Sequence, residues 1–178
     1  GKSTMINLIP RLYDVSDGSI TIDEIDVRDM TQHDLREMIG YVPQKAILFS
    51  GTVASNLRFG NEEATDEEIA DAARIAQAEE FILEKEDGYN SVIAQGGTNV
   101  SGGQKQRLSI ARALIKQPNI YIFDDSFSAL DFKTDHTLRE ALKPYTKESI
   151  TFIVAQRVTT IMNANQIIVL DDGVIVGK

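Results

Sequence analysis

The chain has 178 residues, of which 42% are hydrophobic and 25% charged, so it is long enough and apolar enough for one globular domain. Its formal net charge of −9 argues against a nucleic-acid backbone as the main partner, although a few amides and one lysine can still bind phosphate in an acidic protein. The absence of cysteine excludes disulfides and thiolate metal sites, and no apolar run approaches the roughly 20 residues of a membrane-spanning helix.

The first predicted element is a helix over residues 5–12 that opens at Gly1-Lys2-Ser3-Thr4. This tetrapeptide is the last part of the phosphate-binding pattern G-x-x-x-x-G-K-[ST], whose earlier positions would precede Gly1. The helix N-terminus offers unpaired amides to phosphate, Lys2 reaches the terminal phosphates, and the Ser3 hydroxyl can ligate Mg²⁺. Because the motif is incomplete and the chain stops abruptly at Lys178, we expect an excerpt of a longer protein, truncated at both ends.

Two strands and a long helical stretch are predicted next. Residues 19–23 alternate between apolar and polar side chains, which indicates a half-exposed strand, and residues 38–42 indicate a second strand. From Thr52 to about Glu84 the pattern is helical. Within it, Thr65 followed by Glu68 predicts a capping box at the start of a helix.

The last third of the chain alternates between helices and short apolar runs. A helix over residues 108–115 ends before Pro118. Three strands and one further helix are then expected, the strands at 120–123, 150–154 and 166–170 and the helix at 134–142.

Strands separated by helices predict a three-layer α/β fold with a mostly parallel sheet and an antiparallel β portion near the N-terminus. The helix-rich middle, about residues 52–117, is too long for one crossover connection, so we expect it to form a helical subdomain. Residues 1–51 and 118–178 would form the core of the same single domain.

The predicted strand Ile120-Tyr121-Ile122-Phe123 ends in two adjacent carboxylates, Asp124 and Asp125. A buried strand does not end in two negative charges without cost, because each must keep water or find a cation. In a phosphate-binding site an Asp at such a strand end holds Mg²⁺ through its water shell. We therefore predict that Asp124 holds the metal ion.

Three further motifs point to one family. The stretch Asn99–Arg107, which reads NVSGGQKQR, resembles the signature sequence of ABC-type ATPases and precedes the acidic strand at that family's spacing. Residues 41–44 (YVPQ) resemble its Q-loop and residues 128–131 (SALD) its D-loop, and the match runs along the whole chain. Residues 46–57 resemble the segment found in multidrug, lipid and peptide exporters. The chain thus resembles the nucleotide-binding domain of an ABC exporter.

The resemblance implies a P-loop NTPase sandwich in which two domains face each other head to tail, with ATP and Mg²⁺ as cofactors. One domain would bind each ATP and its metal ion through Gly1, Lys2, Ser3, Thr4, Gln44 and Asp124, and the metal ligands among these would be Ser3, Gln44 and Asp124. The opposite domain would complete the site through Ser101, Gly102, Gly103, Gln104 and Asp131. The implied partners are a second nucleotide-binding domain and the transmembrane domain of the same transporter, without nucleic acid, at the cytoplasmic face of the inner membrane.

Two positions depart from the family pattern. Asp125 stands where hydrolytic members have the Glu that polarises the attacking water, and Gln156 stands where they have a His beside the γ-phosphate. A base must lie within about 2.6–3.2 Å of the proton it takes, and Gln cannot exchange a proton near neutral pH. We interpret these two catalytic positions as a site that binds ATP but has lost most hydrolysis. Such a chain resembles the degenerate-site subunit of a heterodimeric bacterial exporter, whose partner supplies the Glu and His.

Two other functions remain open at this point. A non-hydrolytic ATP-binding module, in which ATP regulates a dimer, is favoured by Asp125 and Gln156, whereas the complete signature favours a motor. A soluble ABC-type ATPase acting on nucleic acid or ribosomes is opposed by the acidic net charge and by residues 46–57.

Overall fold

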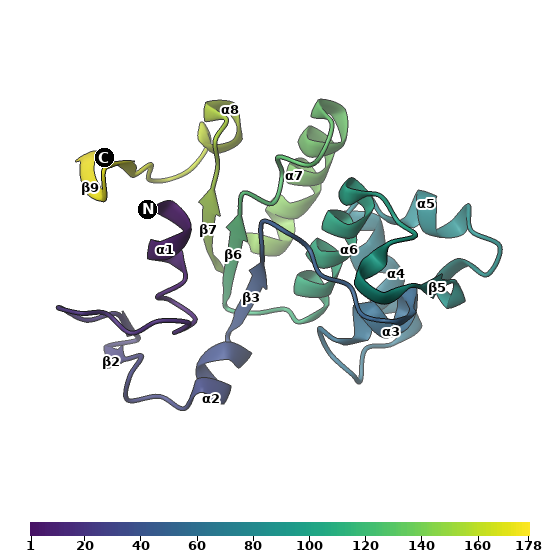
Figure 1. Ribbon diagram of the computed structural model, residues 1–178, viewed down its shortest axis with the longest axis horizontal. Coiled ribbons are helices and arrows are strands. Elements are labelled where there is room, and N and C mark those ends of the chain that lie inside the picture. The colour runs from purple at the N-terminus through teal and green to yellow at the C-terminus, as the bar shows by residue number, and fades with distance from the viewer.

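The computed structural model describes all 178 residues. At its centre lies a parallel sheet of three strands in the order β3-β6-β7, formed by Ile39–Val42, Ile120–Asp124 and Ile150–Val154 (Figure 1). In the register, Ile120 lies opposite Ile39 on one side and opposite Ile150 on the other. Every residue of β6 is buried, as expected for the central strand of a parallel sheet.

Helices cover both faces of this sheet, which confirms the predicted three-layer α/β fold. Because side chains alternate along β6, Ile120 and Ile122 pack on one face with residues of α1 (Lys2–Ile6) and α2 (Gln32–Glu37). Tyr121 and Phe123 pack on the other face with α6 (Gly102–Ile115) and α7 (Phe132–Thr146) (Figure 1). The carboxyl ends of the three strands, where α1 and the loops after β3, β6 and β7 meet, lie at one edge.

The helix-rich middle consists of several short elements. One helical stretch was predicted over 52–84, and the structure has three helices there, α3 (Val53–Arg58), α4 (Asp66–Ile75) and α5 (Glu79–Leu83). The other elements of the middle region are β4 (Gly51–Thr52), the short helix η1 (Gly88–Asn90), β5 (Val92–Ile93) and the short helix η2 (Gln95–Gly97). The strands β4 and β5 pair antiparallel. The predicted capping box of Thr65 and Glu68 is present at the start of α4.

The break after α3 has a packing reason at Gly60. A Cβ atom added at Gly60 would lie 2.2 Å from the backbone carbonyl oxygen of Arg112 on α6, so only glycine allows this close approach.

We expect Gly60→Ala to destabilise the protein by about 2–3 kcal/mol, measured by urea unfolding. The matched control for stability is Gly102→Ala, which places a methyl group in open space on α6, the helix that Gly60 contacts. It should be close to neutral. Equal losses for the two variants would contradict this account.

The N-terminal helix is shorter than predicted. It ends at Ile6, and residues 7–11 form turns, whereas the prediction extended it to Leu12. Pro10 explains the difference, because proline has no N–H to donate to the carbonyl of Ile6 and its ring crowds that carbonyl. The predicted strand at 19–23 is also shorter: β1 (Thr21–Ile22) pairs with β2 (Ile25–Asp26) in the expected antiparallel arrangement.

The predicted strand at 166–170 is present only at its C-terminal end. It forms β8 (Val169–Asp171), which lies outside the parallel sheet and pairs antiparallel with β9 (Val174–Gly177) in a hairpin after the short helix α8 (Val158–Ile161). Asp172 and Gly173, with φ of 45° and 82°, form the turn. An Asp-Gly pair with positive φ is the signal of a two-residue hairpin.

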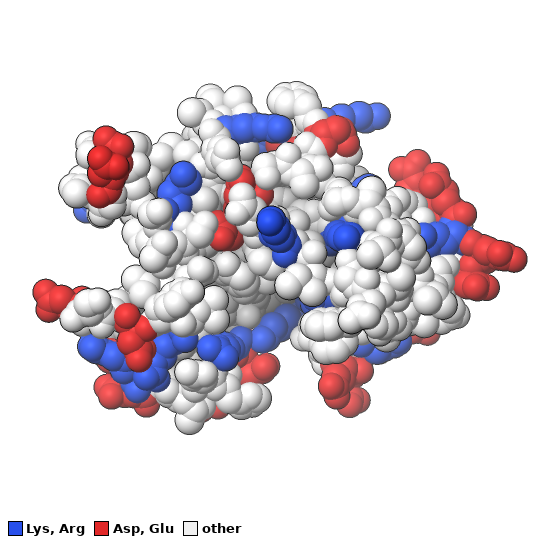
Figure 2. Space-filling view, viewed as in Figure 1, with Lys and Arg blue, Asp and Glu red and all other residues white.

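The surface is unevenly charged. In Figure 2 acidic side chains gather at the end of the molecule where α5 lies, and the chain leaving α5 exposes Glu84, Glu86 and Asp87. None of the helices is both long and apolar enough to cross a lipid bilayer.

Candidate functional site

Ser3 and Asp124 lie side by side at the carboxyl edge of the sheet. The Ser3 hydroxyl, in the first turn of α1, donates a hydrogen bond of 2.9 Å to Oδ1 of Asp124, the last residue of β6. The two residues are 121 positions apart in the sequence. Asp124 is buried and has no cationic side chain bonded to it. The pair therefore presents two hard oxygen donors, the ligand type that Mg²⁺ prefers.

Tyr41 is a member of this site that sequence reasoning did not single out. Its hydroxyl donates a hydrogen bond of 2.9 Å to Oδ1 of Asn7 and lies 3.5 Å from Oδ2 of Asp124. Burial, together with the charge of Asp124, raises the pKa of Tyr41 to about 12, so the phenol keeps its proton. The available signal was alternation along β3, which places Tyr41 on the same face as Ile39, toward α1.

Asp125 is held by both glutamines that the sequence singled out. The side-chain amide nitrogen of Gln44 donates to Oδ2 of Asp125 at 3.1 Å, and that of Gln156 donates to the same oxygen at 2.7 Å. The backbone of Asp125 has φ of 49°, a left-handed conformation that Asp tolerates better than most residues, and its N–H bonds to the carbonyl of Val154. The structure thus brings together the loops after β3, β6 and β7 on one carboxylate.

Gly1, Lys2 and Thr4 surround Ser3 at the start of α1 and are exposed. The main-chain carbonyl of Gly1 accepts from Met5, which begins the helix, while no side chain of this protein bonds to Lys2 or Thr4. These groups are consequently free to bind a phosphate ligand together with Ser3.

The signature residues cap α6. Ser101 accepts a hydrogen bond from the backbone N–H of Gln104, and the Gln104 side chain accepts from the backbone N–H of Ser101, so the two form a capping box. A Cβ atom at Gly103 would lie 3.3 Å from the carbonyl oxygen of Ala129, whereas Gly102 faces open space. Gly103 therefore allows the loop at 128–131 to approach the helix start, and Gly102 leaves the backbone accessible from outside.

Asp131 already has a structural partner. Its carboxylate caps α7 by accepting from the backbone N–H of Thr134 at 3.0 Å and from the Thr134 hydroxyl at 2.6 Å. These hydrogen bonds lower the pKa of Asp131, the hydroxyl contributing most. No hydrogen bond joins Asp131 or the signature residues to the cluster around Asp124 and Asp125, so the structure groups the predicted site residues into two separate sets.

The donor set fits a Mg²⁺–nucleotide complex better than a metal held by protein alone. No group of three or more His, Cys, Asp or Glu side chains is placed to hold a metal ion. Mg²⁺ in phosphate-transferring sites is bound through one or two protein oxygens together with substrate phosphates and water. Ser3 and Asp124 supply that number of oxygens. Gln44, also predicted as a ligand, donates its amide nitrogen to Asp125, which leaves its amide oxygen without a protein partner.

Comparison with known proteins agrees with this arrangement. The family described as ABC transporter matches residues 1–128. The chain belongs to the ABC transporter family. It is 51% identical over 178 residues to the uncharacterized ABC transporter ATP-binding protein YfiB of Bacillus subtilis, covering 100% of this chain and 31% of that protein. It is 47% identical to the putative multidrug export ATP-binding/permease protein SAOUHSC_02003 of Staphylococcus aureus, covering 99% of this chain and 30% of that protein.

A solved structure of a bacterial Atm1-family ABC exporter with ATP bound matches the fold with a TM-score of 0.95 at 37% identity, covering 99% of this chain and 31% of the exporter chain. The chain spans under a third of the length of the curated relatives described above. The predicted resemblance to the ATP-binding domain of an ABC exporter is confirmed by these matches, as is the predicted fold class.

Proposed function

We propose that this chain is the ATP-binding motor domain of an ABC exporter, which couples the binding and hydrolysis of ATP to transport across a membrane. The observation that carries the proposal is the Ser3–Asp124 pair at the junction of α1 and β6. Around it, Lys2 and Thr4 have no protein partner and would bind the phosphates of ATP. Ser3 and Asp124 would hold Mg²⁺, which neutralises charge on the phosphates when it is bound.

Tyr41 would position Asp124 in this site. Its hydroxyl donates to Asn7 at 2.9 Å and lies 3.5 Å from Oδ2 of Asp124, and because the phenol keeps its proton it places no second negative charge beside the carboxylate. This contact on Oδ2 and the hydrogen bond from Ser3 to Oδ1 flank the carboxylate on both sides. The carboxylate would therefore be oriented before the nucleotide arrives.

We further propose that hydrolysis at this chain's own site is impaired. Asp125 has a side chain shorter than Glu by one methylene group, which is about 1.5 Å. One of its oxygens already accepts from both Gln44 and Gln156, so a single oxygen remains to polarise water. Gln156 has no group beside the γ-phosphate that exchanges a proton near neutral pH.

The same features support the second candidate, a module in which ATP binding regulates a dimer without hydrolysis. Measured ATP turnover distinguishes this module from a motor domain.

A head-to-tail dimer would complete both sites. The capping box of Ser101 and Gln104 leaves the backbone at Gly102 open to solvent, so the start of α6 is available to approach the ATP of an opposing domain. Since the signature is nearly complete while Asp125 and Gln156 depart from the family pattern, we propose a heterodimer. In it a partner with Glu and His would hydrolyse the ATP that this signature contacts.

A transmembrane domain would be the second partner. A groove of about 340 Å³ lies beside the loop that carries Gln44 and is lined by Ile47, Phe49 and Phe59 among others. The rings of Phe49 and Phe59 stack with centroids 4.5 Å apart although both are exposed, and Arg112 lies over them at 5.5 and 5.8 Å. Exposed aromatic rings held in place beside the loop that carries Gln44 suit a protein interface. This would place the domain at the cytoplasmic face of the membrane.

We expect Phe49→Ala with Phe59→Ala to uncouple transport from ATP in the intact protein. The groove would lose both rings, so export should fall about tenfold or more while the affinity for ATP stays within about twofold. Export into inverted vesicles and nucleotide binding would be measured on the same preparation. Leu83→Ala, which removes an exposed apolar side chain outside the groove, is the control. Unchanged export in the double variant would argue against this docking surface.

A further inference from the structure

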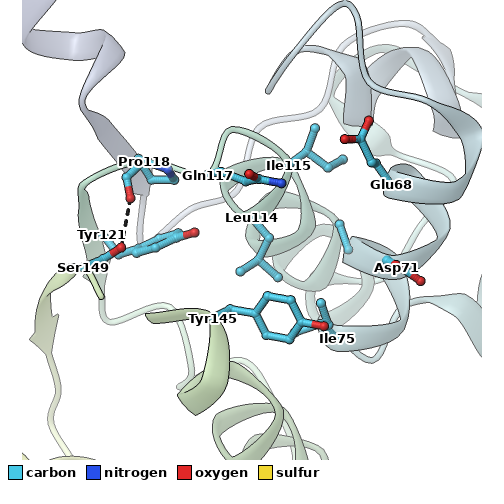
Figure 3. Close-up of a pocket in the computed structure, with 11 residues that line it drawn as sticks. Glu68, Asp71, Ile75, Leu114, Ile115, Gln117, Pro118, Tyr121, Tyr145 and Ser149 are labelled. Carbon is cyan, nitrogen blue, oxygen red and sulfur yellow. Dashed lines mark hydrogen bonds between the residues drawn. The ribbon is translucent and has the colours of Figure 1, made fainter. Parts of the chain in front are cut away.

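A second cavity lies away from the ATP site, between α4, the C-terminal end of α6, β6 and α7 (Figure 3). Its volume is about 330 Å³, within the range of small-molecule pockets. None of its lining residues belongs to the Ser3–Asp124 cluster, the Asp125 cluster or the signature. The cavity therefore needs an explanation of its own.

Tyr121 presents an unpartnered hydroxyl to this cavity. The residue is 2% exposed, yet its hydroxyl makes no hydrogen bond within the protein. Figure 3 shows its ring extending from β6 with the oxygen directed toward Leu114 and the cavity. The oxygen is not one of the fully buried polar atoms that lack a partner, so it opens onto the cavity and can be reached by water or by a bound molecule. A ligand with a polar group would form a hydrogen bond with it.

The wall of the cavity is apolar on two sides. Leu114 and Ile115 from α6 and Ile75 from α4 contribute aliphatic surface, and the ring of Tyr145 on α7 lies beside Ile75 (Figure 3). Tyr145 is 54% exposed, so its ring is available to a ligand. A flat apolar body of one or two rings suits this space.

The charge around the cavity is negative. The only charged residues that line it are Glu68 and Asp71, both on α4. Glu68 caps its own helix and Asp71 accepts from Arg74, which does not line the cavity. The last carbonyls of the 14-residue helix α6 lie at the same place and add partial negative charge. The negative charge and the tyrosine rings that line the cavity together favour a positively charged ligand. Ammonium groups are attracted to carboxylates, to the C-terminal ends of helices and to the faces of aromatic rings.

We propose that this cavity binds a small arylalkylamine, an aromatic ring that carries an alkylammonium group. The ring lies between Leu114 and Tyr145, the ammonium group faces Asp71 and the C-terminal end of α6, and the Tyr121 hydroxyl forms a hydrogen bond with the ligand. The cavity shares no lining residue with the ATP site, so the proposal stands whether or not the proposed function holds.

The test uses three indole compounds of similar shape and different charge on the intact protein. Tryptamine is the cation, 3-ethylindole the neutral analogue and indole-3-propionate the anion, and binding is followed by calorimetry and ligand-observed NMR. We expect tryptamine to bind at least about tenfold more tightly than the other two. Tyr121→Phe, which removes only the hydroxyl, should weaken tryptamine binding about threefold to tenfold, and Tyr145→Ala should weaken it at least as much.

Tyr89→Phe is the matched control, because it also removes a hydroxyl without a hydrogen bond but lies outside the cavity. Binding elsewhere on the protein would be insensitive to Tyr121→Phe and Tyr145→Ala, so only the affinity lost in both variants counts as cavity binding. Equal affinity for the three compounds, tryptamine binding unchanged in both variants, or a dissociation constant above about 10 mM would each overturn the proposal.

Discussion

The double variant Asp125→Glu, Gln156→His is expected to hydrolyse ATP on the order of 100-fold faster than the wild-type protein when each is assayed without a partner. The longer carboxylate extends toward the nucleotide by about 1.5 Å. Replacing Gln156 also removes the shorter of the two hydrogen bonds on Oδ2 of Asp125 and leaves only the one from Gln44, and His supplies a group that exchanges protons near neutral pH. Steady-state phosphate release from the intact protein measures the effect.

The single variants are the controls for this result. Asp125→Glu alone keeps the Gln156 amide, and Gln156→His alone keeps the short carboxylate, so each should recover only part of the gain. Because residue 125 has φ of 49°, replacing Asp by Glu is expected to lower the free energy of unfolding by about 1 kcal/mol or less, which thermal unfolding would detect. Brisk hydrolysis by the lone wild-type protein would refute the impaired site, although the family assignment would stand.

Asp124→Asn is expected to remove most of the Mg²⁺-dependent part of ATP binding, about 10- to 100-fold in affinity. The substitution keeps the shape of the side chain and its contact with Ser3 but removes the negative charge. Titrations with ATP in the presence of Mg²⁺ and again with a chelator would separate the metal-dependent part from the rest. Affinity for ATP without metal should change little, because Lys2 and the backbone at α1 are untouched.

Asp29→Asn provides the matched control, since it removes one carboxylate charge from an exposed position that no part of the site contacts. It should leave both titrations unchanged. If Asp124→Asn bound MgATP as tightly as the wild-type protein, Ser3 and Asp124 would not be the metal ligands, and the central observation behind the proposed function would fail.

Much of the candidate site could be predicted because its signals are local. The residue types around Ser3, Gln44, Asp124 and Gln156 occur in motifs that were recognised one by one, and their common order indicated the family that the comparisons confirmed. Caps followed from neighbouring residues as well. The Thr65 capping box was predicted because both partners lie within four residues of each other.

The contacts between motifs depended on tertiary structure. The sequence named Asp125, Gln44 and Gln156 separately, but only the parallel register of β3, β6 and β7 brings the two glutamines to the carboxylate of Asp125. Tyr41 was missed for the same reason, since its role depends on the position of α1 beside β6. Such contacts join residues that are 31 to 121 positions apart, and no local pattern encodes them.

By itself, the sequence determined the α/β class, the motifs that predict phosphate and metal binding, and the two departures from the family pattern at Asp125 and Gln156, because periodicity, caps and motif spacing are properties of short segments. Tertiary structure alone decided where helices stop against neighbours, as at Gly60, and which strands join the parallel sheet. It also decided that the Tyr121 hydroxyl faces a cavity. These outcomes arise from packing between distant segments, where one close approach or one unpaired group outweighs local preference.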